Sequence, residues 1–113
     1  MTQPEHTTSE SKEGLFWDLA QPLLISGEAE EGTMMGFKCL RVQGKFCASL
    51  ERETNNLIVK LPRQRVQSLI AEGQAEPFAP NGRVFKEWAL IPEMDEALWG
   101  QLLSEAQAFV AGA

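Results

Sequence analysis

Residues 37–50, FKCLRVQGKFCASL, constrain the fold more than any other stretch of this chain. Two runs rich in apolar residues flank Gln43-Gly44. A glycine at the second position of a two-residue loop is typical of the tight turn of a β-hairpin. The stretch therefore predicts two antiparallel strands, and the rest of the chain is expected to cover one of their faces.

A two-residue loop also predicts which residues pair across the hairpin. The expected pairs are Val42 with Lys45, Arg41 with Phe46, Leu40 with Cys47, and Cys39 with Ala48. Side chains alternate between the two faces of a strand, so the pairs define two faces. The expected core face, apolar except at Arg41, carries Phe37, Cys39, Phe46, Ala48 and Leu50. The other face is mixed, and a slip of one residue would exchange the two; it carries Lys38, Leu40, Val42, Lys45, Cys47 and Ser49.

The length of 113 residues is enough for one domain, and the apolar and charged fractions of 43% and 23% are ordinary for a globular protein. Residues 1–8 are expected to form a disordered tail, with a single domain over 9–113. The N-terminus lacks the features of a secretory signal, and no apolar run approaches the ~20 residues of a membrane helix. A cytoplasmic location is the expectation.

The remaining periodicities predict the element order α-β-β-β-α-β-α. Short connections between neighbouring strands favour an antiparallel sheet covered by helices, which is a two-layer α+β domain. A serine of residues 9–11 is expected to cap the first helix, and Pro22 to bend or end it. The other expected elements are an acidic loop at 27–32, a strand at 57–61, a helix from Pro62 to Gly73, a strand at 83–91 and a last helix from Pro92.

Three tryptophans are distributed over these elements. Trp99 belongs to the wide apolar face of the last helix, so it is expected in the core together with Leu102. Trp17 falls off the apolar stripe of the first helix, which favours a place at the rim or in an interface. The strand at 83–91 carries large apolar groups of both parities, including Phe85 and Trp88. It is expected either to be buried on both faces or to change phase at a bulge near Lys86 and Glu87.

Catalytic machinery is not apparent in the sequence. His6 is the only histidine, and it lies in the expected tail. Glu28, Glu30 and Glu31 lack the spacing of a calcium loop, so a solvated acidic turn is expected. Cys39 and Cys47 are expected on opposite faces of the hairpin, as free thiols without a metal. No enzymatic activity and no cofactor are predicted.

Basic residues supply the more informative pattern. Arg63 and Arg65 occupy the first turn of the predicted helix after Pro62, where the helix dipole is already positive. Lys60 precedes them, while Arg41 and Lys45 flank the hairpin turn. Such a group could bind phosphate, nucleic acid or an acidic protein segment, or it could be an ordinary solvated helix end. The net charge of −6 opposes indiscriminate nucleic-acid binding, so any such binding is expected to be weak and steeply salt-dependent.

The segments EGTMMG at 31–36 and LRVQGKF at 40–46 resemble a motif of the MmcQ/YjbR-like domains. The segments at 57–62, 65–66 and 82–91 resemble the related TfoX N-terminal domains. The resemblance implies a small antiparallel sheet packed with helices, a fold described as a double-wing DNA-binding module. The expected function is therefore a non-enzymatic binding domain that recognises nucleic acid through the hairpin and the Arg63/Arg65 helix end. The alternative is a protein-interaction or homodimerisation module that uses exposed aromatic residues and the sheet edge.

Overall fold

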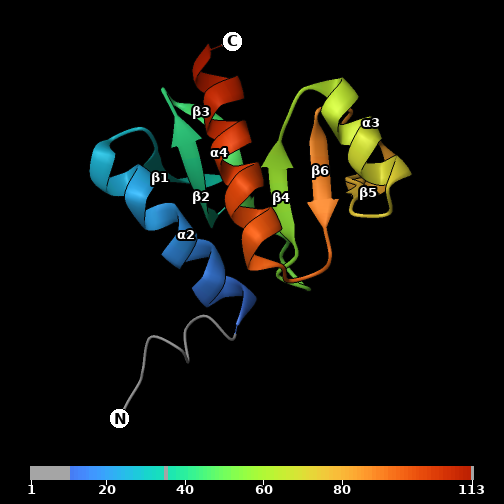
Figure 1. Ribbon diagram of the computed structural model, residues 1–113, viewed down its shortest axis with the longest axis horizontal. Coiled ribbons are helices and arrows are strands. Elements are labelled where there is room, and N and C mark those ends of the chain that lie inside the picture. Colours follow the sequence, from blue (N-terminus) through green and yellow to red (C-terminus); the bar gives the residue numbers. More distant parts are fainter. Residues whose placement is uncertain (1–10, 35, 113) are drawn as a thin grey trace.

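The computed structural model describes residues 11–34 and 36–112 as one α+β unit (Figure 1), which confirms the predicted class. Two long helices lie across one face of a sheet, and a third helix lies beside its far edge. The elements are α2 (Lys12–Ser26), β1 (Glu30–Met34), β2 (Phe37–Val42), β3 (Lys45–Leu50), β4 (Leu57–Lys60), α3 (Arg63–Ala71), β5 (Glu76–Pro77), the 3-10 turn η1 (Pro80–Gly82), β6 (Trp88–Ile91) and α4 (Glu96–Gly112).

Six strands of the described chain form one antiparallel sheet in the order β1-β2-β3-β4-β6-β5. The sequence did not predict β1 or β5, because their residues were assigned to loops. β1 is polar and half exposed, and β5 is only two residues long, so neither shows the alternation of a buried strand. Both strands lie at the edges of the sheet, where such sequences are tolerated.

The hairpin of β2 and β3 is confirmed. Val42 pairs with Lys45 and Arg41 pairs with Phe46, as the two-residue loop predicts. Gln43 and Gly44 have φ values of 54° and 81°. Positive φ at both central positions is what a primed hairpin turn requires.

Beyond these two pairs the predicted register is wrong. Leu40 pairs with Ala48 and Cys39 pairs with Ser49, with a register shift after Leu40. Cys47 is therefore an extra residue on β3, as in a β-bulge. A bulge has no strong signature in this sequence. The predicted pairs beyond Arg41 and Phe46 are therefore wrong by one residue on β3.

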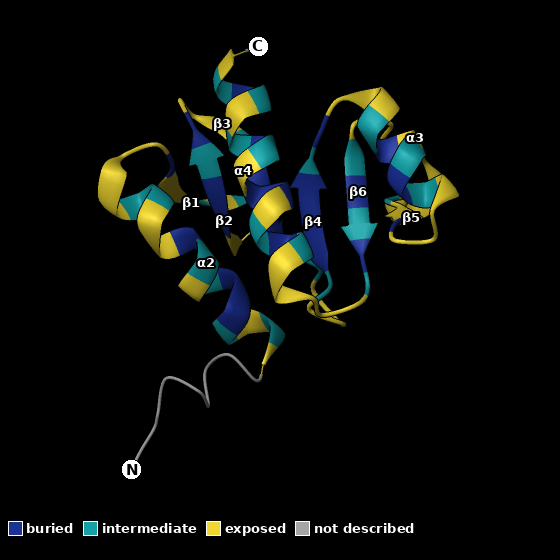
Figure 2. Ribbon diagram, viewed as in Figure 1, coloured by how far each residue is buried: buried dark blue, intermediate teal, exposed yellow. Residues whose placement is uncertain are grey.

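The predicted core face is also wrong for β2. Leu40 and Val42 are buried in the main core, whereas Phe37 is 39% exposed. Lys38 and Lys45 share the face of Leu40 and Val42, and their charges made that face look polar in the sequence. Both lysines lie near strand ends, where long side chains reach solvent. The main core lies between the sheet and the helices (Figure 2). Its largest fully buried members include Leu15, Phe16, Leu40, Leu57, Val59, Leu61, Leu69, Ile91, Trp99, Leu102 and Leu103.

The helix ends follow local chemistry. Ser11 caps α2 by accepting a hydrogen bond from the Gly14 N–H at 2.9 Å, as predicted, and α2 continues through Pro22 to Ser26. The expected start of the last helix at Pro92 is wrong, because α4 begins at Glu96. Asp95 supplies the cap, with its Oδ1 accepting from the Leu98 N–H at 3.0 Å.

Two further boundaries differ from expectation. Pro62 is the N-cap of α3 and the helix itself begins at Arg63. The strand expected over 83–91 is confined to β6, because residues 83–87 form an irregular segment. That segment is tied back by the Phe85 N–H, which donates to the Phe78 carbonyl at 2.9 Å.

Candidate nucleic-acid interface

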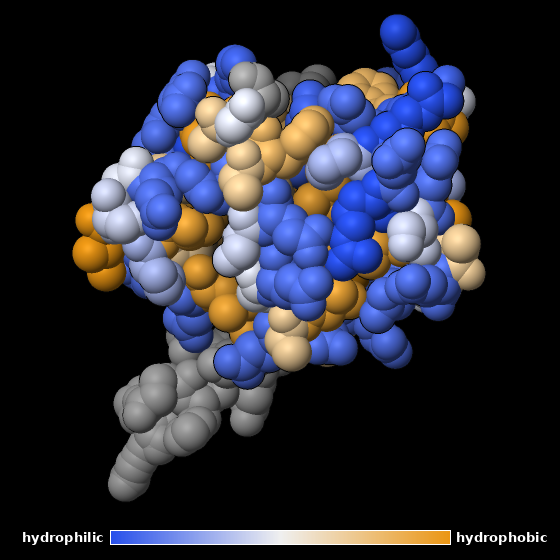
Figure 3. All heavy atoms as spheres, turned by 45° about the horizontal axis from the view of Figure 1, so that its top comes forward, coloured by the Kyte–Doolittle hydropathy of each residue, from blue (hydrophilic) through white to orange (hydrophobic). Residues whose placement is uncertain are grey.

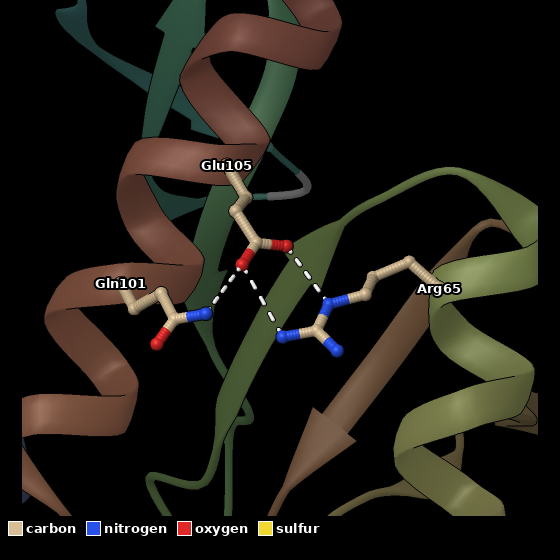
Figure 4. Close-up of polar contacts among 3 residues, drawn as sticks. All are labelled: Arg65, Gln101 and Glu105. Carbon is tan, nitrogen blue, oxygen red and sulfur yellow. Dashed lines mark hydrogen bonds and ion pairs between the residues drawn. The ribbon is translucent and has the colours of Figure 1, made fainter.

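The side chain of Arg65 extends from α3 toward α4, where it forms an ion pair with Glu105 (Figure 4). Its Nε and one terminal nitrogen donate to the two carboxylate oxygens at 2.9 and 3.2 Å, and Gln101 donates to the same carboxylate at 2.8 Å. Burial raises the pKa of Glu105, but these hydrogen bonds and the positive charge of Arg65 outweigh it, so the pKa lies below its ordinary value. Arg65 therefore joins two helices, and its guanidinium is occupied by a carboxylate.

Arg41 is held at the hairpin by backbone carbonyls. Its guanidinium donates to the carbonyls of Thr33 and Gly44 at 2.7 and 2.9 Å. The side chain crosses Gly32, where an added Cβ would come within 2.8 Å of the Arg41 Cδ. Both acceptors are neutral carbonyls, and the carboxylate of Glu30 lies at the same turn, where it accepts from the Gly44 N–H at 3.1 Å.

Lys45, Lys60 and Arg63 lie around one end of the sheet. Lys60 forms a partly exposed ion pair with Glu87 at 3.7 Å. Within the described ranges 11–34 and 36–112, Lys45 and Arg63 have no salt-bridge partner. Two shallow depressions of about 340 Å³ adjoin here, one lined by Lys45 and Lys60 and the other by Lys60 and Arg63. Of the five predicted site residues, Lys45, Lys60 and Arg63 line these two depressions. Arg41 is held at the hairpin, and Arg65 pairs with Glu105.

A stack of aromatic rings adjoins both depressions, with Phe46 lining the first and Trp88 the second. The rings of Phe46 and Trp88 are parallel within 6°, with centroids 4.2 Å apart. Phe78 stacks on Trp88 at 5.4 Å, and Phe85 meets both Phe78 and Trp88 edge-on at 5.8 and 5.3 Å. Three of the rings are half-buried and Phe85 is 37% exposed.

The sheet register shows which way the side chains of Trp88 and Lys60 point. Ala89 on β6 and Val59 on β4 are paired and buried in the core under the helices. The next pair, Trp88 and Lys60, must point to the opposite face, because side chains alternate along a strand. Trp88 therefore lies on the sheet face that α2 and α4 do not cover.

Sequence reasoning missed the aromatic stack. It placed Phe46 in the core and did not single out Phe78. The available signal was the both-sided apolar pattern around Phe85 and Trp88, which ruled out a simple half-buried strand. Stacking of Phe46 on Trp88 additionally requires β3 and β6 to flank β4, which no local pattern reveals.

We refer to these rings and cations together as the aromatic–basic surface. Lys86 adds a fourth cation beside Lys60 and Arg63, with Glu87 as the only carboxylate among the residues lining the two depressions. Figure 3 shows the molecule from the side of α2 and α4 with its top tilted forward, and apolar patches lie there among hydrophilic side chains. The aromatic–basic surface comprises Lys45, Phe46, Lys60, Arg63, Phe78, Phe85, Lys86 and Trp88.

A separate depression of about 300 Å³ lies beside α2 at the opposite end of β2. Trp17, which is half-buried and edge-on to Phe16 at 4.8 Å, lines it together with Phe37. The Arg52 guanidinium lies 4.6 Å from the centroid of the Phe37 ring. Lys38 and Arg52 also line this depression, so they can serve as control positions for substitutions of the cations in the aromatic–basic surface.

The acidic residues of the expected loop are mostly in β1. Glu30 accepts a hydrogen bond from the Gly44 N–H at 3.1 Å, and Glu31 forms an exposed ion pair with Lys38 at 3.4 Å. Both residues are exposed, as expected, but the predicted turn is wrong because they belong to β1. In the described part of the chain, no three His, Cys, Asp or Glu side chains are grouped to hold a metal ion.

Cys39 and Cys47 are buried free thiols. Burial and the neighbouring Cys39 raise the pKa of Cys47 to about 12. His6 and the expected tail over 1–8 lie outside the described residues. None of the helices in the described ranges is both long and apolar enough to span a membrane.

Comparison with protein-family models, curated proteins and solved structures finds no match to this chain.

Proposed function

We propose that this protein is a non-catalytic domain of the MmcQ/YjbR-like type that binds nucleic acid through the aromatic–basic surface. The supporting observation is the gathering of Lys45, Lys60, Arg63 and Lys86 around one aromatic stack in a chain of net charge −6. Cations attract the phosphates, and aromatic side chains interact with bases. The resemblance of residues 31–46 to that family points the same way.

The start of α3 adds a second source of attraction for phosphate. No side chain caps the first turn, so its free backbone N–H groups remain available beside Arg63. Arg41 extends the positive surface toward the hairpin tip. Arg65 is not part of the proposed contact, because Glu105 holds its guanidinium.

A protein-interaction or homodimerisation module is the second candidate. Val84 is 52% exposed and Phe85 is 37% exposed, and neighbouring exposed apolar groups suit a protein partner. Light scattering over a concentration series tests this candidate directly. A concentration-dependent dimer that Val84→Ser abolishes would favour it.

Fluorescence anisotropy with labelled DNA tests the proposed function. Single strands and duplexes are titrated with the parent protein and with an Arg63→Ala/Lys86→Ala variant. Binding by the parent is expected to weaken steeply between about 50 and 200 mM salt, and each lost phosphate contact is expected to lower the slope of log K against log salt by about 0.7–0.9.

A Lys38→Ala/Arg52→Ala variant is the matched control, because it removes the same charge from the depression beside α2. This control is expected to bind like the parent. Absence of binding to both DNA forms at low salt, or equal weakening by the two double variants, would contradict the proposed function.

A further inference from the structure

A groove of about 240 Å³ lies between α3 and residues 84–88. It shares Phe85 and Trp88 with the aromatic stack and Arg63 and Lys86 with the cations. The full lining is Arg63, Val66, Gln67, Ile70, Pro77, Val84, Phe85, Lys86 and Trp88.

The lining is apolar except for one amide and two cations, Arg63 and Lys86, which also line the adjoining depression beside Lys60. Val84 and Phe85 present exposed side chains, and Ile70 is half-buried. Among the described residues that line the groove, Gln67 is the only neutral polar side chain, and its amide can both donate and accept. None of the carboxylates in residues 11–34 and 36–112 lines the groove, although the chain as a whole is acidic. Its charge therefore complements a ligand that has an apolar body and an adjoining anionic group.

The size of the groove limits the occupant. Sites that bury drug-sized ligands span roughly 300–1,000 Å³, so this groove has room for little more than one ring system. A nucleobase has two apolar faces and a polar edge, and in a strand it is flanked by phosphates. Arg63 and Lys86 would lie beside those phosphates, and Gln67 would face the polar edge.

We propose that the groove receives one unpaired base, so that the ligand of the aromatic–basic surface is single-stranded nucleic acid. This inference rests on the proposed function and narrows it. In a duplex both faces of a base are stacked and its edge is paired, so a base must leave the helix before it can enter the groove. Single strands present such bases without that cost.

The test compares three labelled DNA probes of equal length by anisotropy at one salt concentration. The probes are a single strand, its duplex, and a single strand of abasic sugar-phosphate units that retains the charge but lacks bases. The parent is expected to bind the normal single strand most tightly. Loss of one base–aromatic contact typically weakens binding about 5- to 150-fold, and this is the expected deficit of the abasic probe.

Phe85→Leu removes the exposed ring and keeps an apolar side chain in the groove. It is expected to weaken binding of the normal single strand and to leave binding of the abasic strand unchanged. Phe37→Leu is the matched control, since Phe37 is similarly exposed and lines the depression beside α2. Melting temperatures of both variants identify any loss of folding, and Gln67→Ala gives a second groove variant should Phe85→Leu fail to fold.

The outcomes separate the inference from the function on which it rests. Equal or tighter binding of the duplex, or equal binding of the abasic strand, would overturn the groove assignment and leave nucleic-acid binding intact. An acidic, aliphatic-rich peptide that binds with dependence on Phe85, where no single strand binds, would overturn it in favour of a protein partner. Absence of binding to all three DNA probes would overturn both proposals.

Discussion

The Arg65–Glu105 pair shows how one contact changes the role of a predicted site residue. A basic residue in the first turn of a helix adds to the positive end of the dipole, which is unfavourable without an anion nearby. Here the anion is the carboxylate of Glu105 on α4, with both guanidinium distances within hydrogen-bond range. The pair is about one-third exposed, so its contribution to stability is modest.

Glu105→Gln is expected to lower the free energy of unfolding by about 1 kcal/mol at neutral pH. The pKa of Glu105 is lowered in the folded state, so its contribution is present above the ordinary glutamate pKa of about 4.3 and is lost as the pH falls through the lowered value. Urea titrations at neutral and strongly acidic pH measure the difference. Glu53→Gln, at an exposed turn position, is the control, and a parent–variant gap that persists at acidic pH would contradict the assignment.

The buried thiols give a second test at this scale. With its pKa raised to about 12, Cys47 carries almost no thiolate at mildly alkaline pH. Iodoacetamide is therefore expected to modify Cys47 slowly in the folded protein and rapidly in urea, as measured by mass spectrometry. Rapid modification of the native protein would show that this part of β3 opens readily.

At the scale of elements, the β2–β3 hairpin combines a tight turn with a bulge. The turn fixes the two nearest pairs, and the bulge at Cys47 shifts the strands by one residue. The turn places Phe46 opposite Arg41, and the bulge brings Ala48 opposite Leu40 in the core. The bulge thus puts Phe46 and Ala48, which are two residues apart, on opposite faces of the sheet.

Gly44→Ala is expected to destabilise the protein by about 1–2 kcal/mol, because Gly44 has a φ of 81° and an alanine there is strained. An added Cβ at Gly44 would meet no atom within 4 Å, so the strain is conformational. Gln43→Asn is expected to stabilise the turn, since asparagine adopts positive φ more readily. Denaturant titration measures both, and a stability of Gly44→Ala equal to that of the parent would contradict the turn geometry.

At the scale of the whole molecule, α4 joins the parts of the fold. It packs on β2, β3 and β4 and against α2, and through Glu105 it reaches α3. Trp99 is fully buried near its start, and its indole N–H donates to the Glu93 carbonyl at 2.8 Å. The sheet therefore depends on α4 for most of the cover on its core face.

Leu102→Ala is expected to lower the free energy of unfolding by about 2–5 kcal/mol, because Leu102 is fully buried under the sheet. Leu98→Ala, at a half-buried position of the same helix, is the control and is expected to cost less. Thermal and urea denaturation provide the comparison. Equal effects of the two substitutions would mean that α4 does not cover the core as the structure places it.

The sequence by itself determined what depends on neighbouring residues. The turn at Gln43 and Gly44, the cap at Ser11, the apolar face that includes Trp99 and the α+β class all follow from local periodicity and backbone preference. These signals act over a few residues, so they can be read without knowing the fold. They also placed Lys60 and Arg63 next to each other at the entry to α3.

Only the tertiary structure decided the site. The sheet places β4 between β3 and β6, so Phe46 on β3 stacks on Trp88 of β6 across β4. The same packing turns Arg65 toward α4 and leaves Arg63 at the groove. Strand order and helix placement are set by burying the most apolar surface of the whole chain, a sum over long-range contacts that no local pattern records.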